Sequence, residues 1–273
     1  MGLFDWLSGP EKPLNSKEAL ALAAISMVAA DGVVEPEELG VLSSISSIDA
    51  HTVRAALKRF KRLKFNAYSC VDVVTEALDA EQRETVVAIL FDIAVSDGHL
   101  AGDEQALLES YIRAFGLDEA RVEEIGELIS TKNSPVFDDT DQEAESARWS
   151  PRIALGLACL SMIAADGVIE EEEIGVLRSV HTLNVVNILL ALEKFQGLNQ
   201  EPEGCIAPVT ECLNHTQQTT ALAIMFDIAM SDGHLDGAEK ELLGKYMSAF
   251  EVSENRAEQL ADIIALKNRP IFG

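Results

Sequence analysis

The sequence lacks several features that would mark particular classes of protein. Its 273 residues hold only four cysteines and no Cys-x-x-Cys pair, which argues against a disulfide framework. No run reaches the ~20 apolar residues that a membrane span needs, and no secretory signal opens the chain. Lys and Arg number 21 against 46 Asp and Glu, and the net charge of −25 disfavours nucleic acid as a partner. We therefore expect a reduced, cytoplasmic protein.

The composition is that of a folded protein, with 48% hydrophobic and 25% charged residues. The acidic excess favours cations or basic partners, but it also serves solubility alone, and both interpretations stay open. The sequence contains no phosphate loop, nucleophile elbow, His-Glu-x-x-His or dinucleotide fingerprint. We expect no enzymatic activity.

The chain is one unit of about 120 residues written twice, the size of a domain. Three pairs of segments match at a constant offset of 135: 21–42 with 156–177, 91–100 with 226–235, and 132–137 (KNSPVF) with 267–272 (KNRPIF). The first pair is identical at 15 of 22 positions, and the second differs only at Val95 and Met230. The boundaries predicted are an apolar N-terminal segment 1–13, domain 1 at 14–137, an acidic linker 138–149 and domain 2 at 150–273.

Apolar residues recur with helical spacing throughout each unit, and no stretch alternates with a period of two. The fold predicted is therefore all-α, with two tandem domains of about seven helices each. In the first unit the expected helices are 17–30, 36–47, 50–63, 69–78, 82–96, 102–115 and 118–131, with counterparts in the second.

An Asp-Gly-x-aliphatic-x-x-x-Glu signature occurs four times, beginning at Asp31, Asp97, Asp166 and Asp232. The Gly suits a left-handed residue after a helix, and the aliphatic side chain fills the turn. Acidic residues in the next helix's first turn complement its dipole. Folding alone leaves two features unexplained. These are the Asp at the negative end of a helix and the fixed spacing to the Glu.

A bound cation would explain both features, because the signature matches the second half of an EF-hand calcium loop. The upstream ligands are missing, so two half-loops would have to share one weak site, on the order of 10⁻⁴–10⁻³ M for calcium. A purely structural role for the turns is the alternative. The candidate metal ligands are Asp31, Glu35, Glu38, Asp97, Glu104, Asp166, Glu170, Glu173, Asp232, Asp236 and Glu239.

This signature, twice in each helical unit, resembles the tellurite-resistance TerB family and the related N-terminal domain of a membrane-anchored DnaJ-like co-chaperone. The resemblance covers nearly the whole chain as two tandem copies. It implies an all-α fold without established catalytic activity, an acidic cluster proposed to bind metal, and roles in stress response, often near the membrane. The tandem duplication departs from the single-domain member, which puts a tellurite phenotype in doubt.

The sequence has one basic cluster, which lies in the first unit and is largely missing from the second. Its members are Arg54, Lys58, Arg59, Lys61, Arg62 and Lys64. They form either a solvated face that balances nearby carboxylates or a docking patch for an acidic protein, anionic lipid headgroups or the chain's own linker.

The N-terminal segment carries Phe4 and Trp6 within a short apolar stretch. It could pack on the adjacent domain or touch the inner face of a membrane as a peripheral contact. Two functions therefore stand. One is a non-enzymatic protein that binds a divalent metal or scaffolds a stress response. The other is an interaction module that docks through the basic cluster onto an unknown protein partner.

Overall fold

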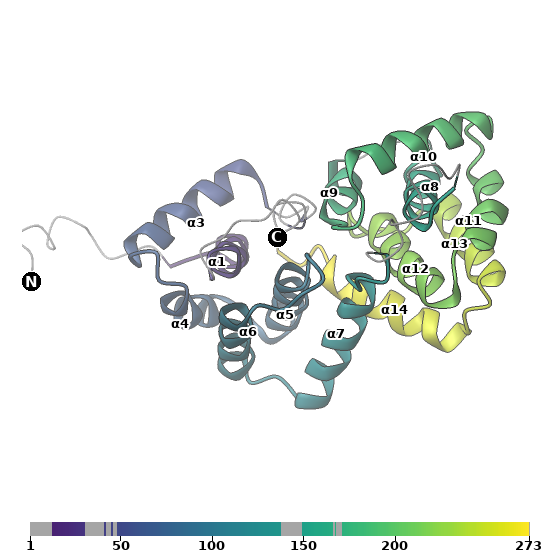
Figure 1. The fold of residues 1–273 in the computed structure, drawn as a ribbon. Helices are drawn as coiled ribbons and strands as arrows, with labels where there is room; N and C mark the ends of the chain where they lie inside the picture. Colours follow the sequence, from purple (N-terminus) through teal and green to yellow (C-terminus); the bar gives the residue numbers. More distant parts are fainter. Residues whose placement is uncertain are drawn as a thin grey trace, which may run out of the picture.

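The structure is a computed structural model that describes residues 13–30, 41, 45, 48–137, 149–165, 167 and 171–272. Within these residues all regular structure is helical, which confirms the all-α prediction. Figure 1 shows two groups of helices side by side, one for each repeat.

The helices of domain 1 are α1 (Ser16–Val28), α3 (Ala50–Arg62), α4 (Tyr68–Ala77), α5 (Ala80–Ala94), α6 (Gly102–Phe115) and α7 (Glu119–Lys132). Those of domain 2 are α8 (Pro151–Ile163), α9 (Glu171–Ser179), α10 (Val185–Gly197), α11 (Ile206–Cys212), α12 (His215–Ala229), α13 (Gly237–Ala249) and α14 (Glu254–Lys267), with a 3-10 turn, η2 (Pro202–Cys205), before α11. The ends in domain 1 lie within about two residues of those predicted. The helix expected at 36–47 lies mostly outside the described residues.

Most of these helices begin at a short polar side chain that accepts a hydrogen bond from a backbone N–H of the first turn. Without this cap the N–H group would have no acceptor within the helix. The residues that do this are Asn15, Asp49, Asp79, Asp118, Ser150, Asn184, Asn214, Asp236 and Ser253. Helix α6 ends at Gly116, whose φ of 66° is left-handed and favours glycine. The local sequence thus sets where the helices start and stop.

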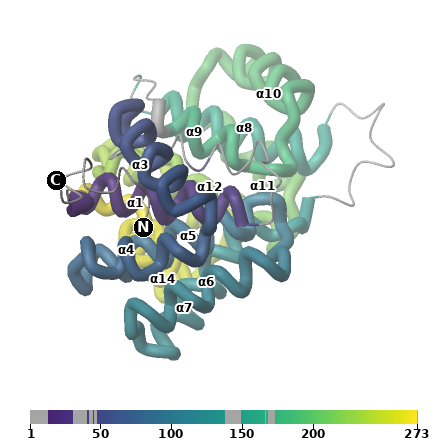
Figure 2. Tube along the Cα trace, turned by 90° about the vertical axis from the view of Figure 1, so that its left-hand side faces the viewer, coloured from purple at the N-terminus to yellow at the C-terminus, as the bar shows by residue number. Residues whose placement is uncertain are grey.

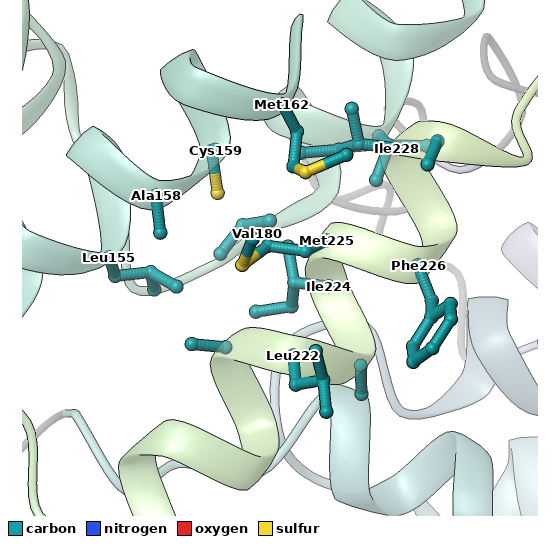
Figure 3. Close-up of a cluster of buried hydrophobic side chains, with 14 of the residues drawn as sticks. Leu155, Ala158, Cys159, Met162, Val180, Leu222, Ile224, Met225, Phe226 and Ile228 are labelled. Carbon is teal, nitrogen blue, oxygen red and sulfur yellow. The ribbon is translucent and has the colours of Figure 1, made fainter. Parts of the chain in front are cut away.

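Each domain is built around the helix before its second Asp-Gly turn, α5 or α12, which is buried along most of its length. Figure 3 shows the core of domain 2, where Cys159 and Met162 of α8 lie opposite Met225 and Ile228 of α12. Cys70 belongs to the core of domain 1. The cysteines form no disulfide. Cys70 and Cys205 are fully buried and serve as small hydrophobic residues, and burial raises the pKa of both thiols to about 12.

The two domains join through the helices α5 and α7 of the first and α12 and α14 of the second, which pack on one another. In Figure 2, viewed from the side of domain 1, the helices α4 to α6 lie in front of α14. One hydrophobic cluster crosses the junction, because Ala88, Ile125 and Ile129 of domain 1 belong to the core of domain 2. The tandem repeat is therefore a pair of fused domains.

Candidate functional site

The Asp of the signature closes the turn that follows α5 or α12. Gly98 and Gly233 both have a φ of 85°, and the Asp before each accepts a hydrogen bond from the backbone N–H two residues on. The distance is 2.8 Å from His99 N to Asp97 Oδ1 and 2.7 Å from His234 N to Asp232 Oδ1. Asp commonly stabilises turns in this way. This contact supplies the structural reason for the Asp that the sequence alone does not reveal.

The Glu of the signature caps the helix that follows the turn. Glu104 accepts from Ala101 N at 3.0 Å, and Glu239 accepts from Asp236 N at 2.8 Å. Each Glu occupies the third position of its helix and is buried, which is the Glu half of a capping box. Because the turn has a fixed length, the capping contact also fixes the distance from Asp to Glu.

The remaining predicted metal ligands are only partly within the described residues. Five of them lie outside the described residues: Asp31, Glu35, Glu38, Asp166 and Glu170. The predicted meeting of the two half-loops in each domain involves these residues and therefore stays a prediction. Glu173 lies on α9 and is buried. In the part of the chain that is described, no three His, Cys, Asp or Glu side chains come together as a metal-binding group. Metal binding stays a prediction.

A buried ion cluster lies where the domains meet, formed by Asp92 on α5, Lys132 on α7, Asp227 on α12 and Lys267 on α14. Lys132 Nζ lies 2.5 Å from Asp92 of its own domain and 2.9 Å from Asp227 of the other. Lys267 Nζ repeats this, 2.5 Å from Asp227 and 3.0 Å from Asp92. The four side chains are at most 3% exposed. Each ammonium group thus bridges both domains.

The ion cluster is balanced in charge and hydrogen bonded. Asn133 Nδ2 donates to Asp92 and Asn268 Nδ2 donates to Asp227, both at 2.8 Å. Burial alone would raise the pKa of the two Asp carboxyl groups, but the Lys132 and Lys267 ammonium groups outweigh burial and hold it below the usual range. Burial alone would lower the pKa of Lys132. The carboxylates of Asp227 and Asp92 outweigh this effect of burial, and the pKa of Lys132 is raised.

The tail after the last helix of each domain packs on the other domain. Phe137 is fully buried in the core of domain 2, and Phe272 is buried in the core of domain 1. Gln217 Nε2 donates to Val136 O at 3.2 Å, and Gln82 Nε2 donates to Ile271 O at 3.3 Å. Such reciprocal contacts are the pattern of an interface between two like subunits, here within one chain.

This junction was not predicted, although the sequence contains signals for it. Asp92 interrupts the apolar stretch Val-Val-Ala-Ile-Leu-Phe, and an Asp within a buried helix needs a partner. The partner, Lys132, opens the KNSPVF tail, and both residues recur 135 positions later. Those repeats were clear from the sequence, but the contact between them was not.

The predicted basic cluster lies on α3 and the turn after it, and we call it the basic surface. Arg54, Lys58, Lys61, Arg62 and Lys64 are exposed, and Arg59 is half-buried. Their helix packs mainly on α1, with Ala56 and Phe60 on the inner face, and lies at the outer edge of domain 1 in Figure 1. The sequence placed these residues on one helix correctly, and their role stays a prediction.

The equivalent helix of domain 2, α10, exposes aliphatic side chains instead. Val185 is 71% and Val186 61% exposed, and Leu189, Leu190 and Leu192 are also exposed. We call these five residues the apolar surface. They recur at helical spacing along one stripe, opposite the buried Ala191 and Phe195. Contiguous exposed apolar residues of this kind commonly mark an interaction site.

The fold and these surfaces define a protein of two fused, all-helical domains. The family model described as "Tellurite resistance protein TerB" matches residues 16–127 and 152–262, one match in each domain. The chain therefore belongs to the TerB family, as two tandem copies. Comparison with curated proteins and with solved structures gave no match.

Two predictions concern membranes. Among the described helices, none is both long and apolar enough to cross a bilayer. Phe4 and Trp6, for which a docking or peripheral membrane contact was predicted, lie outside the described residues.

Proposed function

We propose that the protein is a non-enzymatic cytoplasmic scaffold, in which two fused TerB domains hold two different docking surfaces in a fixed relation. The stress response suggested by the family's name is the setting we propose for it. One surface is the basic surface on α3, and the other is the apolar surface on α10.

The observation that carries this proposal is the contrast between two equivalent helices. Domain 1 has Arg54 where domain 2 has Leu189, and Lys58 where domain 2 has Glu193. Neither pair is buried, so the difference does not serve the packing of either core. The ion cluster and the tails that pack on the opposite domain oppose rotation of one domain on the other. This favours simultaneous engagement of two partners.

The test is recovery of partners from a cell lysate by the immobilised full-length protein. Lys58→Glu with Arg62→Glu should abolish recovery of partners held by the basic surface and leave other partners unchanged. Val186→His with Leu189→Arg, which installs the α3 residues on α10, should do the reverse. If neither variant changes the set of recovered proteins, the scaffold proposal fails.

A second candidate function is weak binding of a divalent metal by the acidic turns, with calcium favoured. Its support is that one turn holds two carboxylates, Asp97, which accepts from His99 N, and Glu104, which accepts from Ala101 N. Calorimetric titration with Ca²⁺, Mg²⁺, Mn²⁺ and Zn²⁺ tests it, comparing the wild type with Asp97→Asn and Asp232→Asn. No heat of binding at millimolar metal would exclude this function.

A further inference from the structure

The basic surface is a concentrated charge in an acidic protein. Residues 50–68 hold six of the chain's 21 Lys and Arg residues and no Asp or Glu, whereas residues 185–203 hold one Lys and three Glu. Basic residues in the last turn of a helix complement its dipole, but domain 2 meets that need with Lys194 alone. Helix stability therefore does not account for the cluster.

Three large apolar side chains are exposed beside this charge. Phe65 is 63%, Tyr68 51% and Leu57 45% exposed. The Phe65 ring meets the buried Phe60 ring edge-on, at 5.6 Å between centroids, so it is held at its base while most of it faces outward. Domain 2 has Gln200 and Glu203 in place of the two exposed aromatic residues.

The backbone at Phe65 is unfavourable for a large side chain. Lys64 and Phe65 have φ values of 59° and 57°, in the left-handed region that costs bulky residues free energy. The same turn in domain 2 carries Asn199 and Gln200 with φ values of 58° and 59°, so both domains adopt this backbone and only domain 1 places an aromatic ring on it. Because Gln200 fits the same position in domain 2, the turn itself does not require an aromatic side chain at Phe65, and the exposed ring there points to an interaction.

We propose that the basic surface, together with Leu57, Phe65 and Tyr68, docks on an anionic phospholipid membrane. Lys and Arg attract the headgroups, while aromatic and aliphatic side chains enter the interface beneath them. The patch lies on the peripheral helix α3, the turn after it and the first residue of α4, Tyr68 (Figure 1), and this short stretch of chain suits a flat surface. The acidic residues elsewhere on the protein do not prevent this contact with the membrane, because salt screens charges beyond about 8 Å at physiological ionic strength.

This inference rests on the docking role proposed for α3 and names its partner. The test is co-sedimentation of the full-length protein with vesicles of phosphatidylcholine, with and without phosphatidylglycerol. We expect binding only to the anionic vesicles and weakening with added salt. Lys58→Glu with Lys61→Glu should lower the partition coefficient by at least about tenfold. Phe65→Gln should lower it about fivefold without loss of thermal stability, because an inserted ring is removed.

Matched controls separate the patch from net charge and from the N-terminus. Arg113→Glu with Lys240→Glu changes the charge equally at exposed sites elsewhere and should leave partition unchanged. Deletion of residues 1–9 should also leave it unchanged. Equal binding to neutral vesicles, no binding to either kind, or equal loss in the control would overturn the membrane inference. If polyglutamate binds the patch while vesicles do not, the membrane inference fails and the docking role survives with an acidic protein as partner.

Discussion

The two domains are nearly the same where they touch each other and unlike where they face solvent on α3 and α10. At the junction Asp92, Lys132 and Asn133 recur as Asp227, Lys267 and Asn268, and each contact within this ion cluster has its counterpart. On the outer helix, six basic residues of domain 1 correspond to a single Lys in domain 2.

This difference separates residues that build the molecule from residues that give it contacts. A buried ion must keep its partner, so the junction constrains both repeats alike. An exposed helix face has no such constraint, so its chemistry can follow a partner. Function is therefore to be sought on α3 and α10, and the predictions below test how far the likeness and the difference extend.

The largest expected effect comes from breaking the ion cluster on one side. Lys132→Ala leaves two buried carboxylates with a single ammonium group, and we expect a loss of about 3–5 kcal/mol in the free energy of unfolding. Lys267→Ala should cost the same if the junction is as reciprocal as its contacts. Urea denaturation followed by circular dichroism measures both.

The control replaces the whole cluster with apolar residues: Asp92→Leu, Asp227→Leu, Lys132→Met and Lys267→Met. Removing all four charges leaves none unpaired, so this variant should stay within about 2 kcal/mol of the wild type or exceed it. A loss as large as that of Lys132→Ala would show that the ions themselves stabilise the junction.

Removing the tail contacts should have the next largest effect. Phe137→Ala and Phe272→Ala each empty a buried site in the opposite domain, and we expect a loss of about 3–4 kcal/mol for each. The exposed Phe65→Ala serves as the control and should change stability little. If Phe272→Ala costs far less than Phe137→Ala, the junction is less symmetric than its contacts indicate.

Acid should weaken both domains together. Because the pKa values of Asp92 and Asp227 are lower in the folded state, their stabilisation is complete above the ordinary value of 3.8 and is lost as pH falls below it. Each carboxyl group contributes a slope of at most about 1.4 kcal/mol per pH unit. Lys132, with a raised pKa, loses its contribution only above 10.5. Thermal melts between pH 3 and pH 7 should show a shallower acid slope for the all-apolar control, and equal slopes would contradict this prediction.

The sequence was sufficient to predict the helices, the duplication and the role of glycine in the turns. These features depend on local spacing, and the predicted range 102–115 coincides with α6. The TerB resemblance, confirmed by the family match, needed only the repeated signature.

What the sequence could not show depends on contacts between distant residues. Asp97 bonds within its own turn, yet the pattern of residues does not distinguish a carboxylate that accepts a backbone N–H from one that holds a cation. Lys132 and Asp227 lie 95 positions apart, and without relatives to compare nothing in one sequence pairs them. The exposure of Phe65 likewise depends on a turn conformation that is rare for its residue type.

The smallest effect is expected at the N-cap of the helix after the second Asp-Gly turn, which is α6 in domain 1 and α13 in domain 2. Ala101 and Asp236 hold the same backbone conformation, with φ near −68° and −67°, but only Asp236 also caps its helix, accepting from Ala238 N at 2.7 Å. Ala101→Asp should therefore complete the cap of α6 and raise the free energy of unfolding by about 1 kcal/mol, and Asp236→Ala should lower it by a similar amount. Both shifts are measurable as changes in the urea midpoint at constant m-value. If Ala101→Asp gave no gain while Asp236→Ala gave the loss, the turn of domain 1 would differ from that of domain 2 by more than this one side chain.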